Sequence, residues 1–214
     1  GGFRFLAKRG PIGKEAKSTI WELVKNRALI FLLMVSSCRV MIGRGTMAFF
    51  PLLLAESFGY TTIGIGWVIT IYYVFGTISS VIMGKLSDYF KNSSLIVVLL
   101  FFGTLSLVLM PIPDKIWGLF ALMILLATTL GPSQGPILSV MAEMVDDKSR
   151  ASSVGLLYTT NEIAGAISPF VGGLIAQAVG LRLSFLFYAL ISLLAAGAGV
   201  MVYRLRERQL LAGG

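Results

Sequence analysis

Two arginines, Arg39 and Arg44, lie inside a long apolar stretch that ends near Pro51. A charged side chain at the centre of a bilayer costs at least about 2.5–3.5 kcal/mol on insertion scales. We therefore expect neither guanidinium to face lipid, and each needs a protein partner or a wet cavity. Five positions separate the two by about 140° around a helix. We expect one to face a cavity and the other a neighbouring helix.

Other polar side chains occur deep in later apolar stretches. Glu162, next to Asn161, is predicted at the same depth as Arg39, so an ion pair between Arg39 and Glu162 is expected. Two interpretations stay open: a structural pair, or a site for substrate or proton coupling, because intramembrane charges are functional by default. Gln134, between two prolines, is a further candidate. Some polar residues are more typical of helix packing: Tyr72, Tyr73, Tyr158, Thr159 and Thr160.

The composition indicates that the bilayer is the solvent. Hydrophobic residues make up 56% of the chain and charged residues 13%, where a soluble domain has about a quarter charged. The net charge of +8 is interpreted as membrane orientation and not as nucleic-acid binding, because the basic residues do not form a groove-binding face. The sequence contains no histidine, which excludes His-based catalysis. We expect no enzyme activity, no cofactor and no metal site.

Six apolar segments are long enough to cross a membrane as helices. They are predicted at 28–55, 62–83, 95–112, 117–142, 152–179 and 183–204. Fourteen of the 18 lysines and arginines fall at one end of the spans, so both termini are expected in the cytoplasm. Pro132 and Pro136 should bend the fourth span. Small residues at Ala164, Ser168 and Gly172 should let another helix approach the fifth.

The segments outside the spans divide the chain further. Residues 1–26 are predicted to be a basic cytoplasmic linker, in which Thr19 and Glu22 form a capping box at the start of a surface helix. Residues 27–206 form the six-helix transmembrane domain, and 207–214 form a cytoplasmic tail. The sequence begins with glycine, not methionine, so we expect a fragment or a processed form.

Two connections carry motifs of a known family. The sequence Gly84-Lys-Leu-Ser-Asp88 resembles the G-x-L-[AS]-D loop of the major facilitator superfamily, which joins the second and third helices of each six-helix half. Glu143 and Arg150 enclose six residues, which is similar to the E-x6-R element of its sugar porters. The resemblance implies an all-α membrane fold with six transmembrane helices in two inverted three-helix repeats, half of a major facilitator fold.

The resemblance also favours one half over the other. The basic and glycine positions that usually follow Asp88 are not kept, and the fourth span has no arginine. These departures favour the C-terminal half, spans seven to twelve. The spacing from Arg39 to Pro51 is similar to that of drug exporters in the family. By this analogy the first and fourth spans line a central cavity, and the second and fifth form the interface with the other half.

The implied function is secondary active transport of a small anionic or amphiphilic solute by alternating access, with proton-coupled efflux. The expected partners are this solute, membrane lipid, and either an N-terminal six-helix half or a dimer mate, in a plasma or inner membrane. The alternative is a non-transporting half-carrier that serves as a scaffold or assembly partner. The expected substrate-binding residues are Arg39, Arg44, Gln134, Asn161 and Glu162. The expected gating and loop-motif residues are Gly84, Asp88, Glu143 and Arg150.

Overall fold

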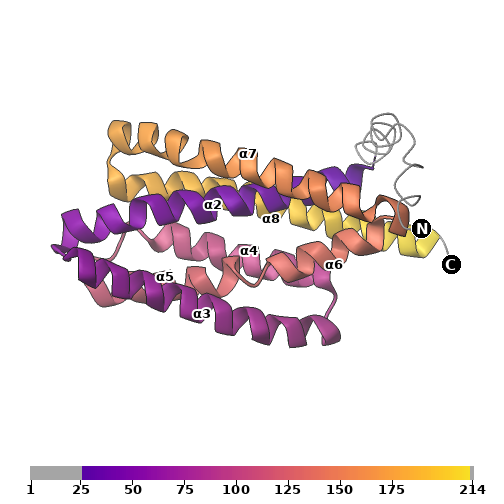
Figure 1. Cartoon of the computed structure of the whole chain (residues 1–214), viewed down its shortest axis with the longest axis horizontal. Helices are drawn as coiled ribbons and strands as arrows, with labels where there is room; N and C mark the ends of the chain where they lie inside the picture. The colour runs from indigo at the N-terminus through magenta and orange to yellow at the C-terminus, as the bar shows by residue number, and fades with distance from the viewer. Residues whose placement is uncertain (1–25, 213–214) are drawn as a thin grey trace, which may run out of the picture.

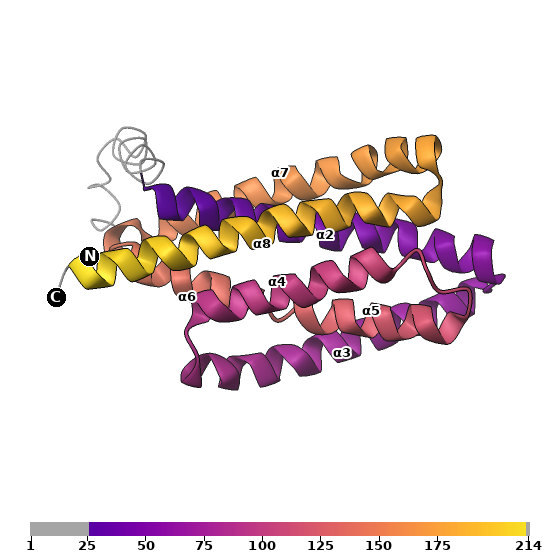
Figure 2. The same ribbon diagram turned by 180° about the vertical axis from the view of Figure 1, so that it is seen from behind.

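The structure, a computed structural model, describes residues 26–212 as a bundle of long helices (Figures 1 and 2). Within this range six segments are long and apolar enough to cross a membrane, and no strand occurs, which confirms the all-helical prediction. The linker and the capping box at Thr19 lie outside the described residues. The helices are α2 (Arg27–Phe58), α3 (Thr62–Tyr89), α4 (Asn92–Leu109), α5 (Ile116–Leu130), α6 (Gln134–Met144), α7 (Asp147–Val179) and α8 (Leu181–Ala212).

Local sequence explains where α2 begins and ends. The side chain of Asn26 accepts hydrogen bonds from the amides of Ala28 (3.1 Å) and Leu29 (3.4 Å), which leaves the first turn capped. At the other end Gly59 adopts a φ of 65° and its amide donates to the Ala55 carbonyl. A positive φ of this kind is tolerated best by glycine, so the helix ends there.

The fourth span is broken, as its two prolines predict. α5 ends at Leu130 and α6 begins at Gln134, with Pro132 in the turn between them. Proline has no amide hydrogen and clashes with the preceding turn, so the helical ladder cannot continue through this segment. The amide of Gln134 donates to the Gly131 carbonyl (3.4 Å), so the chain makes one tight turn and then resumes as a helix.

The helices pack as two interlocked three-helix repeats. α2, α3 and α4 form the first repeat; α5–α6, α7 and α8 form the second. α2 packs mainly on α7 and α8, while α5 packs on α3 and α4, so the first helix of each repeat lies against the second and third helices of the other. α4 and α8, the third helices, pack on each other near the middle (Figure 2). This exchange is the arrangement expected of inverted repeats.

One aromatic ring lies where α2, α7 and α8 meet. Tyr188 of α8 is fully buried, and its hydroxyl donates to the Ser168 carbonyl (3.2 Å). The ring fits because Gly45 and Gly172 have no side chain; a Cβ at either would collide with it. The Ser168 hydroxyl donates to the Met41 carbonyl (2.5 Å), so the predicted small-residue stripe of α7 packs against α2 and α8.

Two helices leave much of their surface open. α3 buries only Val68 and Tyr72, and α7 has large exposed apolar residues such as Ile163 and Phe170. These are the second helices of the two repeats, and both line the face seen in Figure 1. Both chain ends of the described segment lie at the same end of the bundle, as the antiparallel spans require.

Candidate functional site

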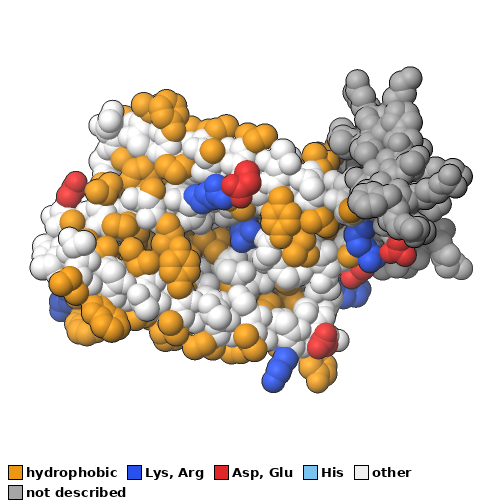
Figure 3. Space-filling view, in the orientation of Figure 1, with side chains coloured by type: hydrophobic (Ala, Val, Ile, Leu, Met, Phe, Trp, Pro, Cys, Tyr) orange, Lys and Arg blue, Asp and Glu red, His pale blue; other side chains and the backbone are white. Residues whose placement is uncertain are grey.

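A cavity of about 380 Å³ opens between α2, α3 and α5, near the middle of the bundle. Figure 3 shows this face, with basic and acidic side chains together at its centre and hydrophobic side chains around them. The cavity is lined by both arginines of α2, by polar groups of α3 and by the C-terminal end of α5. The lining residues are Arg39, Val40, Gly43, Arg44, Met47, Tyr72, Tyr73, Gly76, Thr77, Ser80, Ala127, Leu130 and Gly131.

Arg44 forms the ion pair of this site. Its Nη2 lies 2.6 Å from Oε1 and 2.6 Å from Oε2 of Glu162 on α7, and the two side chains are 44% and 63% exposed. The Arg44 side chain reaches Glu162 by crossing Gly165, where an added Cβ would lie 2.6 Å from Arg44 Cδ. The predicted pair between Arg39 and Glu162 is therefore wrong. Arg39 contacts the segment between α5 and α6 and not Glu162.

Arg39 reaches the break in the fourth span instead. Its Nη1 donates to the Leu130 carbonyl (3.4 Å) and its Nη2 donates to Gln134 Oε1. Leu130 is the last residue of α5 and Gln134 the first of α6, so one guanidinium spans the break. Its charge lies at the C-terminal, negative end of the α5 dipole. Within residues 26–212 no carboxylate lies within ion-pair distance of Arg39.

Asn161, expected at the substrate site, is not among the residues that line the cavity. It is 3% exposed, and its Oδ1 has no hydrogen-bond partner among the described residues. Tyr72 and Tyr73, interpreted from the sequence as packing residues, both line the cavity. Tyr72 is buried and Tyr73 is 58% exposed. Both tyrosines lie one helical turn before Gly76, which also lines the cavity. The sequence could not reveal this role, because the cavity exists only where α5 packs beside α3.

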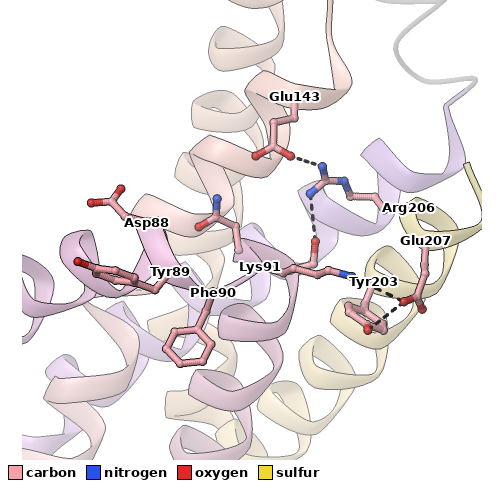
Figure 4. Close-up of a pocket in the computed structure, with 10 residues that line it drawn as sticks. Asp88, Tyr89, Phe90, Lys91, Glu143, Tyr203, Arg206 and Glu207 are labelled. Atoms are coloured by element: carbon pink, nitrogen blue, oxygen red, sulfur yellow. Dashed lines mark hydrogen bonds and ion pairs between the residues drawn. The ribbon is translucent and has the colours of Figure 1, made fainter. Parts of the chain in front are cut away.

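The loop motif borders a second cavity, of about 400 Å³, at the end of the bundle that holds both chain ends (Figure 4). Arg206 of α8 is central: it pairs with Glu143 of α6 and donates to the Ser93 hydroxyl of α4 (3.2 Å). Beside it, Glu207 forms an ion pair with Lys91 (3.8 Å) and accepts a hydrogen bond from the Tyr203 hydroxyl (3.3 Å). Two ion pairs and a hydrogen bond thereby link the ends of α4, α6 and α8.

Two of the four predicted gating residues line this cavity and two do not. Asp88 and Glu143 line this cavity together. Gly84 lies one helical turn away on α3, and Arg150 pairs with Asp147 in the first turn of α7 (3.0 Å). Within residues 26–212, Glu143 and Arg150 therefore form ion pairs with other residues and not with each other.

Arg206 was not singled out from the sequence. The available signal was its spacing, because Tyr203, Arg206 and Glu207 fall on one face of a helix at i, i+3 and i+4. The partners of Arg206 lie on α4 and α6, more than 60 positions earlier in the chain, so the sequence pattern alone does not reveal them.

The fold defines a six-span helical membrane bundle with a charged cavity near its middle. The sequence model of the Major Facilitator Superfamily matches residues 29–212, and the chain belongs to this family. An uncharacterized MFS-type transporter of Methanocaldococcus jannaschii is 24% identical over 179 residues, which cover 82% of this chain and 45% of that protein. The chain thus spans less than half the length of this relative.

Solved structures with a similar fold include peptide transporters. The POT family transporter PepTSo superposes with a TM-score of 0.74 at 13% identity, over 83% of this chain and 37% of that one. A POT peptide transporter bound to alafosfalin gives a TM-score of 0.71 at 20% identity, over 82% and 38%. The same transporter with sulfate gives 0.71 at 19% identity, over 81% and 37%. At these identities the likeness concerns the fold.

Proposed function

We propose that the chain is the C-terminal half, spans seven to twelve, of a secondary active transporter that moves a small anionic solute by alternating access. The proposal rests on the location and the partners of Arg39. This residue lines a cavity at the middle of a membrane-spanning bundle, and its hydrogen-bond partners are a carbonyl and a neutral amide. A charge held at this depth without a counter-charge is costly. An anionic group of the solute supplies that counter-charge.

The charges of the cavity support this choice of solute. The charge of Arg44 is balanced by Glu162, whereas the charge of Arg39 is not balanced by a carboxylate within the described residues. The cavity therefore presents one net positive charge. Apolar groups such as Val40, Met47 and the ring of Tyr73 also line the cavity, which suits a solute with a hydrocarbon body.

Proton coupling and export form the second part of the proposal. Glu162 is the carboxylate beside the cavity, and its protonation would release Arg44. A second anion-binding group would then face the solute. The open faces of α3 and α7 are the surfaces on which an N-terminal half, or a second copy of the chain, would lie. The positive end of the bundle, with both termini, would face the cytoplasm.

The test begins with the native product. Its intact mass, taken from its own membrane, should be near twice the 23.1 kDa of this chain if the chain is one half of a carrier. The whole protein is then purified and screened for thermal stabilisation by carboxylates, sulfonates and phosphate esters. A stabilising compound is used in proteoliposome uptake with and without a proton gradient.

Arg39→Gln should abolish both stabilisation and uptake while the protein still elutes as a folded species. Arg204→Gln, the same change at an exposed position near the end of α8, is the matched control and should transport normally. Full transport by a folded Arg39→Gln protein would contradict the proposed site. A mass near 23 kDa together with no uptake in any condition would contradict the transporter itself.

A further inference from the structure

At the break between α5 and α6, the Leu130 carbonyl has lost its helical backbone partner, and the Gln134 side chain lies at the start of the next helix. In an unbroken helix the Gln134 amide would donate to the Leu130 carbonyl, but here it donates to Gly131 (3.4 Å). The Leu130 carbonyl instead accepts from the Ser133 hydroxyl (2.7 Å) and from Arg39 (3.4 Å). Arg39 therefore compensates for a lost backbone hydrogen bond and, through Gln134, holds the start of α6.

We call the contacts of Arg39 with Leu130 and Gln134 the clamp. The clamp uses only part of the guanidinium. Nη1 and Nη2 are engaged, but Nε is buried with no partner among the described residues. Nε and Nη2 form one edge of the guanidinium, and a carboxylate binds such an edge through two parallel hydrogen bonds. Gln134 has one amide oxygen to offer, so it satisfies Nη2 and leaves Nε unsatisfied. The Nε–Nη2 edge can therefore donate to two oxygens, but it donates to only one among the described residues.

We propose that a carboxylate of the solute displaces Gln134 from the Nε–Nη2 edge of Arg39 and thereby releases α6 from α5. This inference rests on the proposed function and adds two points to it. The solute's anionic group is a planar carboxylate, and Gln134 is the residue that sets the selectivity of the site for it. A carboxylate brings an opposite charge and two parallel hydrogen bonds, whereas Gln134 offers one neutral oxygen, so the exchange favours the carboxylate.

The displacement links binding to motion. Leu130 and Gly131 line the cavity together with Arg39, so a solute that reaches Arg39 also lies against the break. When Gln134 leaves, the contact of Arg39 with Leu130 stays on the α5 side and the contact with α6 is lost. α6 ends at Met144, beside Glu143 and its pair with Arg206, so a freed α6 transmits its movement to the charged cavity at the end of the bundle.

The clamp is tested first without any solute. Hydrogen exchange of the whole protein is followed by mass spectrometry over the peptide 131–140. Gln134→Glu attaches a carboxylate to Arg39 permanently and should slow exchange there by about five- to tenfold, because a charged acceptor replaces a neutral one. Gln134→Ala should speed exchange by a similar factor. Gln177→Glu, the same change at an exposed position of α7, is the control and should leave this peptide unchanged.

The displacement is tested with benzoate, and benzamide serves as its uncharged match. Benzoate, titrated to about 20 mM to cover millimolar Kd values, should speed exchange over 131–140 in the wild type, whereas benzamide should not. Neither should act on Gln134→Glu, whose edge is already filled. Unchanged exchange in Gln134→Glu and Gln134→Ala would overturn the clamp. A benzoate effect that is absent in the wild type, or present in Gln134→Glu, would overturn the displacement.

These readouts separate the inference from the function on which it rests. Exchange is measured without transport, so a protein that moves no anion would contradict the proposed function while a working clamp would still be visible. Conversely, an anion transporter whose Gln134→Glu variant carries carboxylates at the wild-type rate would keep the proposed function and lose this inference.

Discussion

A methyl group added at Gly172 tests whether Tyr188 joins α2, α7 and α8. An alanine Cβ there would collide with the Tyr188 hydroxyl, and would lie 2.6 Å from Cε2 of Phe49 and 3.0 Å from Cζ of Tyr188. Tyr188 is fully buried and Phe49 is 7% exposed, so neither ring has free space to move into. Protein interiors are close-packed, and a displaced ring therefore disturbs its other neighbours.

The magnitude follows from three terms. Overpacking of this kind costs about 1–3 kcal/mol. Loss of the hydrogen bond from Tyr188 to Ser168 adds about 1 kcal/mol. The change from glycine to alanine returns about 1 kcal/mol of helix propensity. The free energy of unfolding should therefore fall by about 1–3 kcal/mol. Gly155→Ala, on the same helix with no atom within 4 Å of its Cβ, should show only the gain.

The assay is unfolding of the purified protein in mild detergent by titration with dodecyl sulfate, followed by circular dichroism. A double-mutant cycle identifies the ring responsible, because Tyr188→Phe removes the hydroxyl that the new methyl group would meet. In that background the penalty of Gly172→Ala should shrink by about 1 kcal/mol or more. The reasoning is refuted if Gly172→Ala is as stable as Gly155→Ala, or if its penalty is the same in both backgrounds.

Two further changes test the charged sites. Gly165→Ala should displace Arg44 from Glu162. Uptake of the solute by the whole protein should then fall about tenfold, which is the effect of one weakened charge-assisted hydrogen bond. The control Gly155→Ala should transport normally. Wild-type uptake by Gly165→Ala would show that this pair is dispensable. Arg206→Gln should lower the free energy of unfolding by about 1–2 kcal/mol in the same titration, because it removes two interhelical contacts. A decrease no larger than that of Arg204→Gln would contradict a structural role.

The spans and the break could be predicted because they depend on local composition. About 20 apolar residues suffice to define a span, and the predicted 28–55 and 152–179 lie within α2 and α7. Proline acts on its own helix, so Pro132 and Pro136 marked the break before any neighbour was known. The family motif at Gly84 and Asp88 gave the repeat arrangement in the same way, from residues close in sequence.

The pairing of charges could not be predicted from depth alone. Arg39 and Glu162 do lie on parallel spans, but depth fixes only one of the two coordinates of a helix surface. The other is the direction around the axis, where Arg39 and Arg44 differ by about 140°. That direction depends on which helices flank α2, and on Gly165, whose missing side chain gives Arg44 its route to α7. Neither is visible in a hydropathy pattern.

The partners of the α2 arginines are synthesised late. Gln134 follows Arg39 by 95 positions, and Glu162 follows Arg44 by 118. At about 5–20 residues per second, roughly 5 to 25 s pass before each guanidinium can meet its partner. During that interval α2 carries two charges that lipid disfavours. During biogenesis α2 must therefore stay next to water or the insertion machinery until α5, α6 and α7 exist, so the spans enter the bilayer as a group and not one at a time.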